Sequence, residues 1–406
     1  MENKIIKICC VLLSLIMMIC TLSISTGNVY ARFENKVSCR TILDLSKKTE
    51  NNANFFTKTS EANVVVLAGK LDNEETITFK LESPEAETKG KFFLNSPNAI
   101  EGNEVSKCDT SSAEFQSKNT GLIDAVGSEE ELLEEVRALV CMLPANNEDD
   151  ASYDECLDNL NRVCDGIETV ADDAALLATL VSDEQIFFET KREYAKDMVT
   201  GFIRLNGMTV GVVANRSKVF DEEGNVAEEL ETTLSEGGCK KATDFVEFCD
   251  AFNIPIATFT NVTGFQACKC AEKRLARESA KLTYAFANAT VPKVNVVVGK
   301  AFGSAYITMN SKSIGADMVY AWPNSEIGMM DANLAAKIMY AGEDAATIKE
   351  QADTYQALQV SPMSAARRGY VDTIIEPKDT RKYLIGAFEM LFTKREDRPS
   401  KKHGTV

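Results

Sequence analysis

The stretch best suited to chemistry is VNVVVGKAFGSAYITMN, which runs from Val294 to Asn310. An apolar, β-branched run typical of a buried strand meets three small residues, Gly303, Ser304 and Ala305. Small residues after a buried strand allow another molecule to touch the backbone itself. The residues alone leave two interpretations open: a site where backbone N–H groups bind a ligand, or close packing of a helix on a sheet.

The chain holds one histidine, His403, in the C-terminal sequence KKHGTV. A Ser-His-Asp triad or a histidine-based metal site needs a histidine in the folded body, so we expect neither. Any chemistry therefore falls to backbone dipoles, carboxylates, lysines or thiols. The net charge of −17 also disfavours nucleic-acid binding, which needs a basic surface.

Twelve cysteines are present, and three of them lie in the apolar N-terminal stretch. The other nine are an odd number without repeated CxxC spacing, which is typical of a reducing compartment rather than a disulfide framework. Cys268 and Cys270, in CKC, are a close pair. We interpret them as an exposed helix start in preference to a metal or redox site.

Strands alternate with helices from about residue 200 onward. The sequence predicts strands within 254–262, 293–299 and 317–323, and helices around 239–252, 269–288, 331–340, 348–359 and 380–392. Asn206-Gly207 marks the tight turn of a hairpin that precedes them. This alternation predicts a largely parallel sheet that helices cover on both faces.

A separate helix is predicted in GSEEELLEEVRALVCMLP, with Ser128 as its N-cap and Glu131 completing a capping box. Its expected apolar face comprises Leu132, Leu133, Val136, Leu139 and Val140. The acidic sequence after Pro144 is interpreted as a linker.

Residues 1–31 have the pattern of a secretory signal peptide. Lys4 and Lys7 precede an uncharged apolar run, and Val29-Tyr30-Ala31 is a small-residue cleavage pattern. The run is also long enough for a short membrane anchor, through residues 5–25.

The sequence over 32–90 is polar and lacks a clear period, so we expect a weakly ordered segment. Two short strands are predicted within it, at 64–67 and 76–81.

Several motifs, in a consistent order, resemble the biotin-dependent acyl-CoA carboxyltransferases, such as the β-subunit of propionyl-CoA carboxylase and the transferase subunit of methylmalonyl-CoA decarboxylase. They are TGFIRLNGMTVGVVANRS, FVEFCDAFNIP, TFTNVTGF, ATVPKVNVVVGKAFGSAYITMNSKSIGADMVYAWPNSEIG, ARRGYVDTII and FEMLFTKREDRPSKKHGTV. The resemblance spans about 91–406 and is most specific over 200–406. It implies an α/β, crotonase-like (ClpP/crotonase) fold of two lobes, an N-lobe for acyl-CoA and a C-lobe for biotin.

The resemblance also implies a division of the chain. The biotin-side C-lobe occupies 171–406, and a remnant of the N-lobe with a linker occupies 91–170, after the segments 1–31 and 32–90. The glycine-rich turn of the N-lobe falls before about Lys91, where the chain shows no βα pattern, so no acyl-CoA residues are identified.

In this family each lobe has an oxyanion hole of two backbone N–H groups at a glycine-rich turn. By position the resemblance assigns this role to the N–H groups of Ser304 and Ala305, where one donor is typically worth roughly 3–4 kcal/mol of barrier. It places Gly303, Tyr306 and Ile307 at the biotin pocket. Ser304 stands where the family usually has glycine, and the apolar Ile307 suggests a non-acidic acyl end.

Gly264 and Phe265 match a loop that borders the biotin site in the family. Thr263 replaces the family's proline, and the sequence after Phe265 is largely different. We therefore expect the orientation of the substrate at this border to differ from that in the family.

The implied activity is carboxyl transfer between carboxybiotin on a partner carrier protein and a short-chain acyl-CoA, without a metal. The implied partners are the biotin carrier and full-length carboxyltransferase subunits, or further copies of this chain, in a hexamer-like oligomer. One alternative is a non-catalytic, truncated paralogue that binds biotin or packs within an oligomer. Another, from the signal-like segment alone, is a secreted non-enzymatic protein. Because acyl-CoA and biotin carriers are cytosolic, we expect a cytoplasmic location, with the tether at 5–25 as the membrane-associated variant.

Overall fold

The computed structural model describes residues 91–101, 108–147, 149, 153–221 and 223–398, together with β1 (Phe56–Lys58), β2 (Val64–Lys70) and β3 (Thr76–Glu82). The signal-like segment at 1–31 and its tether lie outside the described residues. The chain divides into two compact units, Met1–Gln116 and Ser117–Val406.

The first unit contains a three-stranded antiparallel sheet in the order β1–β2–β3. The strands predicted at 64–67 and 76–81 are confirmed, and each is slightly longer than expected. Two short helical turns follow, η2 (Pro97–Ala99) and α3 (Ala113–Phe115).

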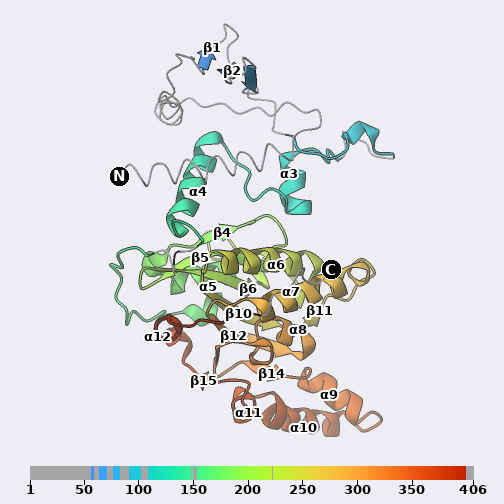
Figure 1. Ribbon diagram of the computed structural model, residues 1–406. Helices are drawn as coiled ribbons and strands as arrows, with labels where there is room; N and C mark the ends of the chain where they lie inside the picture. Colours follow the sequence, from blue (N-terminus) through green and yellow to red (C-terminus); the bar gives the residue numbers. More distant parts are fainter. Residues whose placement is uncertain are drawn as a thin grey trace. The chain divides into compact units, whose positions relative to one another are not determined.

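The second unit is built on an eight-stranded sheet. In Figure 1 its labelled strands follow one another from β4 downward to β15, among the helices. The strands run in the order β15–β13–β12–β10–β6–β5–β4, and β14 also pairs with β12. Their bounds are β4 Phe188–Thr190, β5 Met198–Leu205, β6 Met208–Asn215, β10 Ile256–Val262, β12 Lys293–Phe302, β13 Met318–Ala321, β14 Glu326–Gly328 and β15 Thr373–Ile374. Every pair from β6 to β15 is parallel, which confirms the predicted, largely parallel sheet.

The β5–β6 hairpin closes at Asn206-Gly207, as predicted. Both residues have left-handed φ values, +52° and +78°, which the tight hairpin turn requires. A Cβ at position 207 would lie 2.0 Å from the carbonyl oxygen of Asp154. Glycine is therefore needed here for its conformation and for the close approach of the 153–154 segment.

Helices cover both faces of the sheet. On one face lie α6 (Glu236–Ala251), α7 (Leu275–Asn288) and α8 (Gly303–Thr308), over a core that includes Phe202, Phe245 and Phe286. On the other lie α5 (Ala174–Val181) and α12 (Thr380–Leu391), over a core that includes Phe259, Trp322 and Phe388. Successive side chains of a strand point to opposite faces of the sheet, so they pack alternately in these two cores.

The remaining helices confirm most predictions but adjust some boundaries. They are α9 (Ala332–Met339) and α10 (Ala345–Tyr355), near the predicted ranges, and α11 (Pro362–Arg367), where no helix was predicted. The helix expected from residue 269 begins only at Leu275, because Arg274, at φ −141°, separates α7 from the helical turn Ala271–Lys273. Among the described residues, no helix combines the length and the apolar character needed to cross a membrane.

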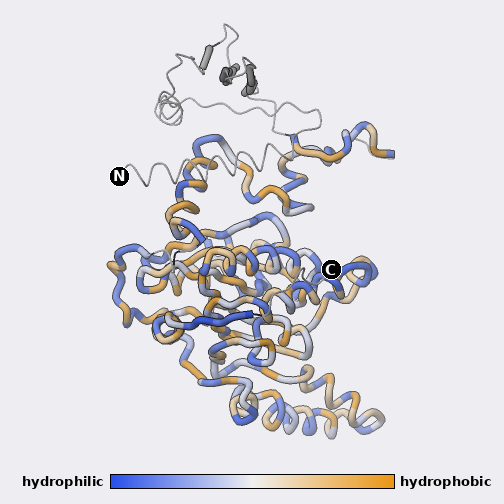
Figure 2. Tube along the Cα trace, viewed as in Figure 1, coloured by the Kyte–Doolittle hydropathy of each residue, from blue (hydrophilic) through white to orange (hydrophobic). Residues whose placement is uncertain are grey.

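The helix α4 (Glu129–Met142) has the predicted capping box, in which Ser128 and Glu131 bond each other's backbone N–H. Hydrophobic and hydrophilic residues alternate along it in Figure 2. Its apolar face is not buried as expected, because Leu133, Val136 and Val140 are 40–49% exposed. The period predicts the helix, whereas only the tertiary structure decides which of its residues are covered.

Candidate functional site

The candidate site lies where β12 runs directly into α8. Gly303, the first residue of α8, has φ +61°, a region that L side chains seldom adopt. A Cβ on Gly303 would also lie 3.2 Å from the carbonyl oxygen of Met329. The sharp strand-to-helix turn therefore favours glycine for two independent reasons.

The N–H groups of Ser304 and Ala305 belong to the first turn of α8, where the helix itself supplies no acceptor. The N-cap residue, Phe302, offers no side-chain oxygen, and within the described ranges neither N–H has a hydrogen-bond partner. Ser304 is exposed and Ala305 is buried. The turn can therefore donate hydrogen bonds to an incoming acceptor.

The next two residues of α8 point to different environments. Tyr306 is buried, its hydroxyl has no partner among the described residues, and burial raises its pKa, with Asp372 and Tyr370 adding to the rise. Ile307 is 41% exposed, and Met329, beside Gly303, is 75% exposed. Two apolar side chains are thus exposed next to the turn, and the tyrosine is a neutral core residue.

The structure brings the predicted loop residues to the same place. Gly264 and Phe265 form β11 (Gly264–Phe265), which pairs with β9 (Thr233–Leu234) and lies beside α8. Thr263, where the resemblance in sequence places the family's proline, donates its N–H and its hydroxyl to the carbonyl of Thr232, at 2.7 and 2.8 Å. A proline could make neither bond, so the substitution ties this loop to the β9 segment.

Cys268 and Cys270 are exposed, at the start of the helical turn Ala271–Lys273, as predicted. The Cys268 thiol accepts the N–H of Ala271 at 3.3 Å. Among the described residues, no three or more histidine, cysteine, aspartate or glutamate side chains gather as metal ligands would.

Sequence reasoning missed a cleft of about 460 Å³ at the carboxyl ends of the parallel strands. Its lining comprises Asp172, Ser217, Lys218, Glu229, Leu230, Thr232, Asn261, Gly299, Lys300, Asn324 and Glu326. Lys218, on the short strand β7 (Lys218–Phe220), pairs with Asp172 at 2.7 Å, and that carboxylate raises the lysine pKa. Ligands of open α/β sheets bind at this edge, but the described lining includes no residue of 303–307.

Reasoning from the sequence also missed two buried asparagines beneath α8, Asn295 and Asn310. The available signal was an asparagine inside the valine run of β12, where a buried strand would hold only apolar side chains.

A buried lysine lies on α6. Lys241 is 1% exposed and donates to the carbonyl oxygen of Tyr194 at 3.0 Å. Burial lowers its pKa to about 8. Nearby, burial raises the pKa of Asp197, against a 2.7 Å hydrogen bond from the Ser235 hydroxyl.

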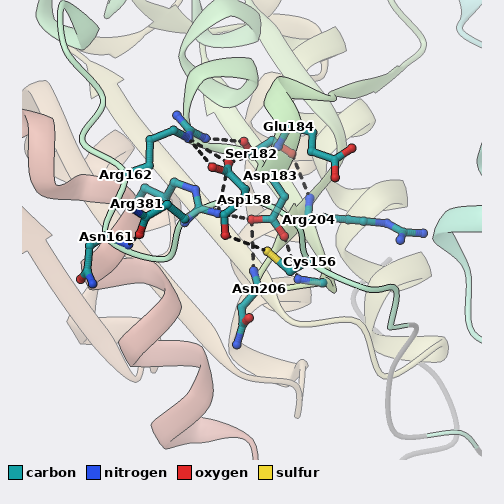
Figure 3. A network of polar contacts seen from close by, with 12 residues as sticks. Cys156, Asp158, Asn161, Arg162, Ser182, Asp183, Glu184, Arg204, Asn206 and Arg381 are labelled. Carbon is teal, nitrogen blue, oxygen red and sulfur yellow. Dashed lines mark hydrogen bonds and ion pairs between the residues drawn. The ribbon is translucent and has the colours of Figure 1, made fainter.

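A second buried polar cluster surrounds Arg381, at the hairpin end of the sheet (Figure 3). Arg381 is fully buried, pairs with Asp183 and lies 3.4 Å from the carboxylate of Asp158. Asp183 in turn accepts the N–H groups of Asn206 and Gly207, at 3.2 and 2.7 Å.

Arg162 completes this cluster by binding both oxygens of Asp158 and the carbonyls of Leu180 and Ser182. Burial opposes ionisation of Asp158, but its bonds from Arg162 and Glu184 and the charge of Arg381 hold its pKa below the usual value. These contacts join α12, the hairpin and the 158–162 segment, so we assign the cluster a structural role.

Comparison with known proteins identifies one family. The model of the carboxyl transferase domain matches residues 86–406. The carboxyltransferase subunit of propionyl-CoA carboxylase from Haloferax mediterranei is 37% identical over 333 residues, which are 78% of this chain and 63% of that protein. Methylmalonyl-CoA decarboxylase subunit alpha from Propionigenium modestum is 34% identical over 334 residues, 78% of this chain and 63% of that protein.

Solved structures give the same result. Transcarboxylase 12S, with methylmalonyl-CoA and methylmalonic acid bound, superposes with a TM-score of 0.70 at 35% identity, covering 77% of this chain and 62% of that one. This likeness confirms the predicted crotonase-like α/β fold. The chain spans a little under two thirds of the length of these relatives.

Proposed function

This chain belongs to the carboxyl transferase domain family, and on that premise we propose that it transfers a carboxyl group between biotin on a partner protein and a short-chain acyl-CoA. The observation that carries the proposal is the family match over 86–406, which includes the whole strand-to-helix turn at Gly303. Relatives named for propionyl-CoA and methylmalonyl-CoA chemistry suggest acyl groups of that type.

In this proposal the N–H groups of Ser304 and Ala305 form an oxyanion hole. Carboxylated biotin supplies an activated carboxyl group when bound. Two donors in a fixed turn stabilise negative charge as it develops on an acceptor oxygen, and each is worth roughly 3–4 kcal/mol of barrier. The fit rests on the two N–H groups, which have no acceptor within the described part of the chain.

The acyl group in this proposal is short and uncharged at its end. Ile307 and Met329 expose apolar side chains beside the turn, at 41% and 75% exposure. A carboxylate held against them would lose water without gaining a hydrogen bond or an opposite charge. These side chains favour a propionyl-type substrate end over an acidic one.

The proposal includes partners and a location. The transcarboxylase 12S structure is described as a hexamer assembly, and we propose that this chain likewise works beside further carboxyltransferase subunits, which supply the acyl-CoA side, and beside a biotin carrier protein. We place it in the cytoplasm, where acyl-CoA and biotin carriers occur, with residues 5–25 as a candidate membrane tether.

The test follows labelled carboxylate from methylmalonyl-CoA to biotin, with the full-length chain alone and mixed with the Haloferax subunit in an inactivated form. Ser304→Pro removes one N–H donor at a helical position that tolerates proline, and Ser304→Ala keeps that donor. We expect Ser304→Pro to lower kcat by about 10²–10³-fold, as the loss of one oxyanion donor does, and Ser304→Ala to change it little.

Turnover that survives Ser304→Pro would contradict the oxyanion assignment. Absence of turnover in every mixture, with biotin or the Haloferax subunit still bound, would favour the non-catalytic alternative of a biotin-binding or oligomer-packing subunit.

A further inference from the structure

The sheet face that carries α6, α7 and α8 is not uniform. Beneath α6 and α7 the contacts are apolar, from residues such as Phe245, Leu282 and Phe286. Beneath α8 lies a row of polar side chains that are at most 6% exposed, which we call the amide seam. It comprises Asn215, Thr258, Thr260, Asn295 and Asn310.

Asn295 joins the sheet to the end of α8. Its side-chain oxygen accepts the hydroxyl of Thr260, on the neighbouring strand β10, at 2.9 Å. Its side-chain N–H donates to the carbonyl oxygen of Met309, the C-cap of α8, at 3.2 Å. One fully buried amide thus connects a strand hydroxyl to the last turn of the helix.

Asn310 makes a second connection, from the segment that follows α8 back to the sheet. Its backbone has φ +49°, a left-handed conformation that asparagine tolerates better than most residues. From there its side-chain N–H reaches back to the hydroxyl of Thr258 at 3.2 Å, and Thr258 donates to the carbonyl of Val294 at 3.3 Å. The chain that leaves α8 is therefore fixed to β10 and β12.

Filling a core with the polar side chains of the amide seam stabilises the fold less than filling it with apolar side chains would. A buried neutral hydrogen bond adds little net stability, because the same groups bond to water in the unfolded chain. The oxygen of the Asn310 side chain has no partner within the described ranges, which adds to the cost. Apolar residues fill the neighbouring core under α6 and α7, so what the amides add under α8 is direction, since hydrogen bonds depend on angle and apolar contacts do not.

We propose that Asn295 and Asn310 are positioning residues, which hold α8 at its C-terminal end and so fix the direction of the Ser304 and Ala305 N–H groups at its other end. This inference rests on the proposed function of those N–H groups. A helix of six residues is about 9 Å long. A tilt of about 10° at its end would displace the first-turn N–H groups by roughly 1.5 Å, and about 1 Å of misplacement can cost about 10²-fold in rate.

The experiment uses the full-length chain in the carboxyl-transfer assay with the inactivated Haloferax subunit. Asn295→Leu replaces the amide by an apolar group of similar size, and Thr260→Val removes only the hydroxyl that Asn295 accepts. Thr243→Val is the matched control, because among the described residues this buried hydroxyl bonds only the carbonyl of Cys239, in its own helix, at 2.8 Å.

We expect Asn295→Leu to lower kcat by about 100-fold and Thr260→Val by about 10-fold, with KM for biotin changed by less than about 2-fold. Thr243→Val and Thr260→Ser, which keeps the hydroxyl, should both retain the wild-type kcat. If Thr260 had a merely structural role, Thr243→Val and Thr260→Val would lower the melting temperature by similar amounts. Neither variant would then lower kcat while leaving KM unchanged.

Amide hydrogen exchange supplies a readout that needs no turnover. In Asn295→Leu, exchange of the 303–310 segment should be about 10-fold faster, while the 281–288 segment of α7 should be unchanged. Wild-type kcat and exchange in Asn295→Leu would overturn the inference. If the wild-type chain shows no transfer, the proposed function fails, and the exchange rates alone then decide whether the seam holds α8.

Discussion

Two of the regions in which the second unit buries polar groups use different chemistry. Around Arg381 the groups are charged, and they connect segments that are far apart in sequence: Arg381 and Asp183 are 198 residues apart. Under α8 the groups are neutral amides and hydroxyls on adjacent strands and one short helix. The charged region acts as a clamp between these segments. It is strong because removing either partner of a buried ion pair leaves the other as an uncompensated buried charge. The neutral region contributes little energy and a defined direction.

The largest expected effect comes from breaking the charged clamp. Asp183→Ala should lower the free energy of unfolding by about 3–5 kcal/mol, because it leaves the fully buried Arg381 without its nearest carboxylate. The hairpin N–H groups of Asn206 and Gly207 lose their acceptor as well. Urea unfolding of the full-length chain, followed by circular dichroism, measures the change.

The control for this clamp is Asp244→Ala, which removes the same side chain from an exposed pair with Lys240. It should cost about 0.5 kcal/mol or less. Equal losses for the two variants would show that burial of the Arg381 pair does not matter, contrary to the comparison.

Lys241 is an intermediate case, a buried cation with a carbonyl partner and, in the described ranges, no carboxylate at ion-pair distance. Its folded pKa of about 8 lies below the 10.5 of the free side chain, so between these values the unfolded chain binds more protons and stability rises with pH. Relative to Lys241→Met, the wild type should gain up to roughly 3 kcal/mol between about pH 8 and 10.5.

This gain is measured as the difference between the urea midpoints of the two proteins at several pH values, so that thiols and tyrosines common to both cancel. Lys240→Met, at the exposed neighbouring position, is the matched control and should run parallel to the wild type. A Lys241→Met curve parallel to the wild type would mean that this lysine titrates as it does in water.

The smallest effect is expected in the neutral region. Tyr306→Phe removes a buried hydroxyl that has no partner among the described residues, so it should change stability by less than about 1 kcal/mol, in the stabilising direction if at all. Thr260→Val removes a hydroxyl bonded to Asn295 and should cost about 1–2 kcal/mol. Thermal unfolding of both variants gives the contrast, and a larger loss for Tyr306→Phe would reveal an acceptor for that hydroxyl.

Local signals in the sequence predicted most of the second unit. The Asn206-Gly207 turn, the capping box of α4 and the alternation of strands and helices each depend on residues close together in the chain. The glycine turn at 303 was predicted for the same reason, since a strand followed by small residues restricts the backbone locally.

The features that the sequence did not predict depend on tertiary register. Thr258 and Asn295 stand opposite each other only because β10 and β12 pair in that register. Asp183 meets Arg381 only after α12 has packed on the sheet, and the cleft gathers residues from Asp172 to Glu326. The face of α4 shows the same limit: its period is a local property, whereas its exposure is a property of the fold.

The two edges of the large sheet have a consequence for solubility. Its outer strands are β4, of three residues, and β15, of two. A strand at the edge of a sheet can capture another extended chain through its unpaired backbone groups, and very short edge strands leave few such groups available. A sheet of eight strands, with valine-rich interior strands such as β12, therefore ends on both sides in edges that resist aggregation through strand pairing.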